Sequence, residues 1–407
     1  MMNKKNRAVG GAPIVESRKK SLGIYVHIPF CRSKCEYCDF YSIPGARSKE
    51  LMTRYLDAVI AHIRESAPCA VGYEVDTVYF GGGTPSFFGA TGLSRIFAEI
   101  DRRFDVSRDA EVTLEANPDS VTLPMLTQLR RAGFNRISIG VQSDIDEQLK
   151  ALGRPHNYKQ AQQAVSMARR AGFNNVSVDL MFGLPNQTRE QWMQTLRNVI
   201  DRKADHMSCY GLKVEPGTKL YEYRACANLP DDDAQADMYF YCVETLEQFG
   251  YHQYEISNFA KDGYICRHNM KYWTGDEYLS FGPCAASDFA GKRFTIAPDI
   301  EKYMDGVLNK GAILSECETV PMRERAGEYL MLRLRTVDGV EEGEYTKSFL
   351  LPFEPLEEVF QKLAKQDLCK NVSGRWRLTP KGFMLSNSII VLLLEQQQKS
   401  KPLTQKK

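Results

Sequence analysis

A strand-like run followed by a helix-like run recurs six times between residues 23 and 249. The strand-like runs are short and rich in Val, Ile, Tyr and Phe, as strands buried on both faces are. Alternating strands and helices build a parallel sheet, because each helix returns the chain to the same end of the sheet. The sequence therefore predicts an α/β fold, a partial or full parallel (β/α) barrel of about six units.

The strands are expected at Gly23–Ile28, Thr77–Phe80, Glu111–Glu115, Arg136–Val141, Asn175–Leu180 and His206–Leu212. The helices are expected at Lys49–Ser66, Leu93–Phe104, Pro124–Ala132, Lys159–Ala171, Arg189–Asp201 and Ala234–Phe249, where apolar residues recur every three or four positions. In barrels of this kind the chemistry lies at the C-terminal ends of the strands. Motifs at those ends are therefore the first place to look for a function.

The pattern weakens after about residue 260. Residues 255–290 are predicted to be loop-rich, with helices at 300–308, 323–335 and 355–365, a hairpin at 371–378 and a last helix at 381–395. These elements predict a smaller, mainly helical, winged-helix-like C-terminal module. The expected organisation is a disordered basic extension (1–20), the barrel (21–255), a substrate loop segment with a linker (256–320), the C-terminal module (321–395) and a disordered tail (396–407).

Charge and hydropathy narrow the function classes. The net charge is only +2 over 407 residues, so composition gives no electrostatic case for a nucleic acid or an anionic membrane. The basic segment 1–20 lacks the apolar core of a secretory signal. The apolar run Ile389–Leu394 is too short to span a bilayer. We therefore expect a cytoplasmic protein with no transmembrane segment.

Three of the eleven cysteines, Cys31, Cys35 and Cys38, lie within eight residues directly after the first strand. Four cysteines ligate a [4Fe–4S] cluster completely, so three leave one iron free to bind a small molecule. The alternative is a structural zinc site, which needs four ligands. No second CxxC occurs, and Cys266 with His268 could complete a zinc set only from far along the chain. The spacing favours a cluster.

Polar or glycine residues follow each of the next four strands. They are Gly82, Gly83 and Thr84 after the second, Glu115 at the end of the third, Gln142 after the fourth with Arg154 in the next loop, and Asp179 in the fifth. Glycines let a backbone approach a ligand closely, and an arginine pairs well with a carboxylate. Each residue alone could be a cap or a surface group. Together they predict a ligand site at one barrel mouth.

The CxxxCxxC spacing and these strand ends resemble the radical S-adenosylmethionine superfamily. The resemblance implies that Cys31, Cys35 and Cys38 hold a [4Fe–4S] cluster, that S-adenosylmethionine binds its open iron, and that one-electron reduction releases a 5′-deoxyadenosyl radical. It also implies an electron donor such as a flavodoxin or ferredoxin. The residues expected to contact cofactor are Tyr25, Tyr37, Gly82, Gly83, Thr84, Glu115, Gln142, Arg154 and Asp179.

Further strings, at 214–218 (VEPGT), 253–258 (QYEISN) and 266–273 (CRHNMKYW), resemble the coproporphyrinogen III oxidase-like branch, and within it the HemW-like heme chaperones. The oxidases carry a further cysteine where this chain has Phe40. The resemblance implies a heme chaperone that delivers heme to an unidentified acceptor protein. It makes His268 the heme-linked residue, with Cys266 and Cys284 as alternatives.

Two other functions stay open at this point. One is a radical oxidoreductase that decarboxylates a tetrapyrrole oxidatively, and the other is a non-catalytic zinc or scaffold protein. One position also departs from the branch, whose members usually carry Gly-Ala-His where Ala286 stands in place of the histidine. This exchange removes a polar group from the predicted substrate mouth and leaves room for a different tetrapyrrole.

Overall fold

The computed structural model describes residues 19–45 and 48–403. Six parallel strands form the barrel predicted from the sequence, namely β1 (Lys20–Ile28), β4 (Tyr73–Gly82), β5 (Val106–Ala116), β6 (Arg136–Gln142), β7 (Asn175–Phe182) and β8 (His206–Gly211). Every residue of β6 is buried, as expected for a strand in the middle of a sheet that is covered on both faces. The α/β fold class is confirmed.

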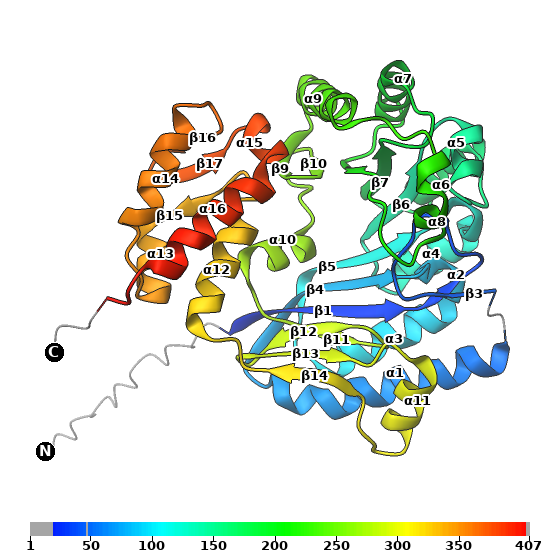
Figure 1. Cartoon of the computed structure of the whole chain (residues 1–407). Helices are drawn as coiled ribbons and strands as arrows, with labels where there is room; N and C mark the ends of the chain where they lie inside the picture. Colours follow the sequence, from blue (N-terminus) through cyan, green and yellow to red (C-terminus); the bar gives the residue numbers. More distant parts are fainter. Residues whose placement is uncertain (1–18, 46–47, 404–407) are drawn as a thin grey trace, which may run out of the picture.

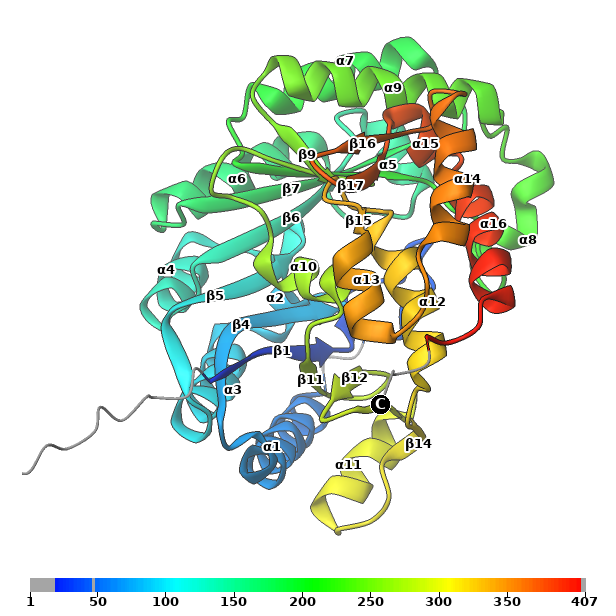
Figure 2. The same ribbon diagram turned by 90° about the vertical axis from the view of Figure 1, so that its left-hand side faces the viewer.

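Six long helices connect these strands and cover the outer face of the sheet (Figures 1 and 2). They are α1 (Lys49–Ser66), α3 (Ala90–Arg103), α4 (Leu123–Arg131), α6 (Tyr158–Arg170), α7 (Arg189–Ile200) and α9 (Asp232–Gln248), with the short α2 (Pro85–Phe88), α5 (Asp146–Ala151) and α8 (Lys219–Tyr223) in the connections. Side-chain caps fix several starts, including full capping boxes at Asn157 and Thr188.

The barrel is partial, because β1 and β8, the outer two of these six strands, do not pair with each other. β8 pairs with antiparallel β10 (Asn258–Ala260), which pairs with β9 (His252–Glu255). β1 pairs in parallel with β11 (Tyr278–Phe281), which continues through β12 (Ala286–Phe289), β13 (Lys292–Ile296) and β14 (Leu314–Glu318). These strands together form one 12-stranded sheet.

The loop-rich character predicted for residues 255–290 is wrong. This segment contains β10, β11 and β12 together with α10 (Arg267–Thr274). Beyond it, α11 (Ile300–Leu308) lies where a helix was predicted. Strands of three to five residues are too short to show a reliable alternation of apolar and polar residues. Whether 256–320 forms a separate functional unit stays a prediction.

The C-terminal module holds the helices α12 (Met322–Arg333), α13 (Glu342–Phe349), α14 (Glu354–Ala364), α15 (Pro380–Met384) and α16 (Ser386–Lys399), and a small sheet of β15 (Val340–Glu341), β16 (Cys369–Val372) and β17 (Arg375–Leu378). Backbone bonds from Ile256 to Arg335 and from Val337 to Tyr254 join it to β9. In Figure 1 it lies at the left, on the side of the curved sheet away from α6 and α7.

The predicted disordered tail is wrong for its first part. α16 runs to Lys399, and the Leu403 amide donates to the Leu350 carbonyl over 2.8 Å. The last helix also divides at Leu385 into α15 and α16. Residues 1–18 of the predicted N-terminal extension and residues 404–407 lie outside the described residues.

Candidate cofactor and heme site

The predicted cluster ligands lie on the loop that leaves β1. Cys31 ends the two-residue strand β2 (Phe30–Cys31), which pairs with β3 (Ile43–Pro44), so the cysteine loop is closed at its base. Cys31 is buried, whereas Cys35 and Cys38 are half-buried. Burial raises the pKa of the Cys31 thiol and raises that of Cys38 to about 11. These thiols therefore stay protonated at neutral pH until a metal replaces their protons.

A chain of polar contacts joins this loop to two strand ends and to the loop after α5. Thr84 Oγ1 lies 3.3 Å from Cys31 Sγ and accepts from Asn117 Nδ2 over 3.1 Å. Arg154 Nη2 donates to Asn117 Oδ1 over 2.7 Å, and Arg154 Nη1 donates to Cys35 Sγ over 3.6 Å. The loop is thus tied at both Cys31 and Cys35 to the ends of β4 and β5 and to the loop after α5.

Asn117 is the central residue of this chain, and sequence reasoning missed it as a site residue. It follows β5 directly, two positions after Glu115, so the strand-end rule that selected Glu115 could also have selected Asn117. What the sequence could not show is that its amide nitrogen and oxygen both have partners from elsewhere in the chain, Thr84 after β4 and Arg154 in the loop after α5.

Gln142 and Glu115, two residues predicted to contact cofactor, have different neighbours. Gln142 ends β6 with a left-handed φ of 67°, and its Nε2 and Arg154 Nη2 both lie beside Gly140. Glu115 accepts from Tyr79 OH over 2.8 Å and from the Gly82 amide over 3.2 Å. Burial raises the pKa of Glu115 to about 7, so its carboxyl is partly protonated near neutral pH.

Asp179 and Tyr25 are also held by neighbouring side chains. Asp179 accepts from Ser138 Oγ over 2.9 Å, and burial raises the pKa of its carboxyl. Tyr25 OH lies 3.1 Å from His27 Nδ1, and His27 Nε2 lies 2.9 Å from the Tyr41 carbonyl oxygen. Burial raises the pKa of Tyr37, and the neighbouring Arg154 guanidinium acts in the opposite direction.

The glycines at the end of β4, Gly82 and Gly83, allow close packing of the protein's own residues. Gly82 has φ +109°, and a Cβ there would come within 2.5 Å of the His27 ring. A Cβ on Gly83 would lie 2.9 Å from the Ile28 carbonyl oxygen and 3.0 Å from that of Phe30. The Gly83 and Thr84 amides donate to these same two oxygens. The glycine run therefore lets β4 approach the backbone that carries Cys31.

Replacing Gly83 by alanine is expected to lower the free energy of unfolding by about 1–3 kcal/mol, because the added methyl overpacks a backbone contact. The shift of the Cys31 backbone should also reduce cluster loading during anaerobic reconstitution. Gly343→Ala is the control, since its Cβ would meet only Glu341 Oε1 at 3.6 Å. Equal urea midpoints for Gly83→Ala and the wild type would contradict this account.

The residues present fit a cluster with an amino acid at its open iron. Arg154 Nε is buried without a hydrogen-bond partner, so a donor suited to a carboxylate is free beside Cys35. Among the described residues no three His, Cys, Asp or Glu side chains converge on one metal ion. Cluster ligands need no such convergence, because each thiolate binds a different iron.

His268 lies inside the curved sheet, on α10. The Arg267 and His268 amides at the start of α10 donate to Glu111, which anchors the helix to β5. His268 is 1% exposed, with Nδ1 2.9 Å from Thr77 Oγ1 and Nε2 2.9 Å from Tyr272 OH. Burial lowers the pKa of His268 to about 3, so the imidazole is neutral.

A cavity of about 350 Å³ opens between the cysteine loop and β11–β12. It is lined by Tyr25, His27, Asp39, Phe40, Tyr41, Tyr272, Tyr278, Cys284, Ala285 and Ala286. Its volume is in the range of small-molecule sites, and aromatic rings make up much of its wall. Phe40, which stands where the oxidases carry a further cysteine, and Ala286, which departs from the usual histidine, both line this cavity.

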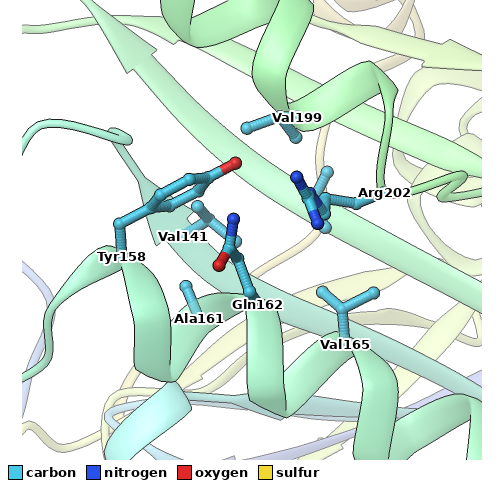
Figure 3. A pocket seen from close by; sticks show the side chains of 8 residues that line it. Val141, Tyr158, Ala161, Gln162, Val165, Val199 and Arg202 are labelled. Atoms are coloured by element: carbon cyan, nitrogen blue, oxygen red, sulfur yellow. The ribbon is translucent and has the colours of Figure 1, made fainter.

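A second, much smaller cavity lies outside the sheet. Figure 3 shows it between α6 and the end of α7, with a volume of about 10 Å³ and mostly aliphatic walls such as Val141, Val165 and Val199. It has room for about one water and lies away from the cysteines. We assign it no function. Among the described residues, no helix has the length and apolar character needed to cross a membrane.

Comparisons with known proteins agree with this arrangement. The family model described as Radical SAM superfamily matches residues 25–199, and that of the HemN C-terminal domain matches 320–385. The heme chaperone HemW of Haemophilus influenzae is 34% identical to this chain, over 92% of this chain and 98% of that protein. The mitochondrial radical S-adenosyl methionine domain-containing protein 1 of Mus musculus is 33% identical, over 97% and 92% of the two chains.

A solved structure is also similar to nearly the whole chain. Coproporphyrinogen III oxidase (HemN) from Escherichia coli, described as a radical SAM enzyme, matches with a TM-score of 0.81 and 25% identity over 93% of this chain and 91% of that one. The parallel barrel and the C-terminal module are both included in that coverage. With the cysteine loop at the barrel mouth, these matches show that the chain belongs to the radical SAM superfamily and, within it, to the HemW family.

Proposed function

We propose that this protein is a heme chaperone, which binds heme and passes it to an acceptor protein. In this proposal Cys31, Cys35 and Cys38 hold a [4Fe–4S] cluster, and S-adenosylmethionine binds beside it. When bound, the cluster supplies an electron for the reduction of S-adenosylmethionine, drawn from a donor such as a flavodoxin or ferredoxin. Reduced cysteines suit a reducing compartment, which supports a place in the cytoplasm.

The observation that carries the proposal is the position of the 350 Å³ cavity. It lies between the cysteine loop, which contributes Asp39, Phe40 and Tyr41, and the β11–β12 turn. A porphyrin needs flat apolar contact surface and an iron ligand, and this wall offers aromatic rings beside phenol, imidazole and thiol groups. The names of the HemW relatives support heme as the ligand.

Residues around the cysteine loop would hold the cluster, S-adenosylmethionine and heme next to one another. Arg154 positions the cysteine loop through Cys35 and keeps a free Nε for a carboxylate. Thr84 and Asn117 fix the other end of the loop at Cys31. Phe40, 64% exposed, places an apolar ring at the cavity wall where the oxidases have a thiol. Its exposed face would be covered by a bound porphyrin.

A radical oxidoreductase acting on a tetrapyrrole is the second candidate. The likeness to coproporphyrinogen III oxidase over nearly the whole chain favours it. Phe40 counts against it, because the family resemblance places a further cysteine there in the oxidases. The two functions differ in whether the tetrapyrrole is turned over.

A heme titration of the anaerobically reconstituted protein tests the proposal. We expect saturable binding of one heme per chain, followed by absorbance, and no rise in 5′-deoxyadenosine when coproporphyrinogen III is added. Sustained 5′-deoxyadenosine formation that depends on the porphyrinogen would instead establish the oxidoreductase. Failure to bind heme at any concentration would exclude the chaperone function.

A further inference from the structure

We propose that the phenol oxygen of Tyr272 is the ligand to the iron of bound heme, and that His268 positions this phenol without touching the iron. The inference rests on the proposed heme-binding function. It replaces the sequence-based prediction that His268 itself is the heme-linked residue.

The surroundings of His268 leave no place for an iron. Both ring nitrogens already lie 2.9 Å from a side-chain oxygen, Nδ1 from Thr77 and Nε2 from Tyr272. The Tyr79 ring stacks on the imidazole with 5.1 Å between centroids, and the Tyr25 ring stacks at 6.4 Å. Binding of iron would have to displace one of these groups from a side chain that is 1% exposed.

Tyr272 stands between His268 and the cavity. The two residues are four positions apart on α10, so they lie on one face of the helix. The Tyr272 ring lines the cavity, where Tyr278 meets it edge to face at 4.7 Å. His268 is not among the lining residues. A heme seated in the cavity can therefore reach Tyr272 and not the imidazole behind it.

Tyrosine is an established type of haem ligand. The hydrogen bond from a second residue orients such a ligand and adjusts its basicity, as carboxylates do for metal-bound histidines. Here the second residue is buried and fixed on its other side by Thr77, so the direction of the phenol oxygen is fixed as well. This is the arrangement that a ligand must have before iron arrives.

The proton balance of the step is simple. The Fe(III)–O bond forms, the phenol O–H bond breaks, the proton leaves to solvent, and the iron stays ferric. His268 keeps its one ring proton on Nε2 throughout, and donates it to the phenol oxygen before the step and to the phenolate after it. Its Nδ1 accepts from the Thr77 hydroxyl, which can act as donor or acceptor. The same two contacts thus serve the free and the bound state with the imidazole neutral in both.

Cys284 is the competing ligand. It is exposed, lines the same cavity, and has a left-handed φ of 62°. No hydrogen bond of the described structure orients its thiol toward the cavity, whereas Tyr272 is held at 2.9 Å. Thiolate and phenolate ligands to ferric heme have different spectra, so the two assignments can be separated directly.

The test is a hemin titration of the reconstituted full-length protein, with the iron ligand read from resonance Raman spectra. We expect iron–phenolate bands in the wild type. Tyr272→Phe should lose these bands and weaken hemin binding by at least roughly 10- to 100-fold, the range for supporting residues at metal sites. Tyr241→Phe on α9, outside this cavity, removes a phenol that accepts from Arg197 Nε over 3.0 Å; it is the matched control and should keep both.

His268→Gln separates a positioning role from a ligand role. We expect it to shift the iron–phenolate bands and to retain them, with the cluster intact. Iron–phenolate bands that survive in Tyr272→Phe, or a wild-type spectrum of thiolate or imidazole ligation, would overturn the inference while leaving heme binding established. A wild type that binds no hemin would overturn the proposed function and this inference together.

Discussion

Replacing Cys35 by alanine is expected to leave the anaerobically reconstituted protein with no [4Fe–4S] cluster and to abolish S-adenosylmethionine binding with it. Only two thiolates would remain for the cluster, and the open iron that chelates the amino acid would be lost. The change also removes the acceptor of Arg154 Nη1, which frees the loop at one of its two tied ends. Iron and sulfide analysis together with equilibrium dialysis against S-adenosylmethionine measure both effects.

Cys69→Ala is the matched control for this variant. Cys69 is exposed and lies after α1, outside the site, so the control should load cluster as the wild type does. A full complement of iron and sulfide in Cys35→Ala would show that the cluster ligands are assigned wrongly. Cluster loss in both variants would point to a general effect of cysteine removal on folding.

Replacing Glu255 by glutamine is expected to lower the free energy of unfolding at acid pH and to raise it at alkaline pH. Glu255 is 1% exposed, and burial raises the pKa of its carboxyl from 4.5 to about 7. Below pH 4.5 the carboxyl is protonated in both the folded and the unfolded chain. As the pH rises to about 7, this carboxyl ionises first in the unfolded chain. The free energy of unfolding of the wild type therefore falls by up to about 3 kcal/mol.

Glutamine avoids this loss but makes a poorer hydrogen bond. Glu255 accepts from the Ser257 amide over 3.2 Å and from Asn258 Nδ2. A glutamine amide can serve only one of them as acceptor, which costs about 1 kcal/mol. Glu255→Gln should therefore be less stable than the wild type by about 1 kcal/mol at pH 4.5 and more stable by about 2 kcal/mol at pH 8.5.

Urea unfolding at the two pH values, followed by tryptophan fluorescence, measures this crossing. Glu244→Gln on α9 changes an exposed carboxylate and should show no crossing. If Glu255→Gln were the less stable protein at both pH values, the carboxyl would be ionised in the folded state through contacts that offset its burial.

The barrel was predictable because its signals are local. The helix predicted at Lys49–Ser66 has those same bounds in the structure, since an amphipathic pattern over 18 residues decides its own conformation. The strands, likewise, were marked by runs of β-branched and aromatic residues, and α11 was found at Ile300–Leu308. The short strands β12 to β14 were missed because their pairing, not their composition, makes them strands.

For the site, the sequence by itself determined which side chains are present and at which strand ends they stand. Three thiols within eight residues already predict a cluster, because the loop that carries them is short. Only the tertiary structure decided the contacts between them. Thr77 and His268 are 191 residues apart, and Cys35 and Arg154 are 119 apart, so no local pattern could show that they touch. The burial of His268 and the exposure of the Tyr272 ring to the cavity follow from how α10 packs into the open barrel, because burial is a property of neighbours that the fold supplies.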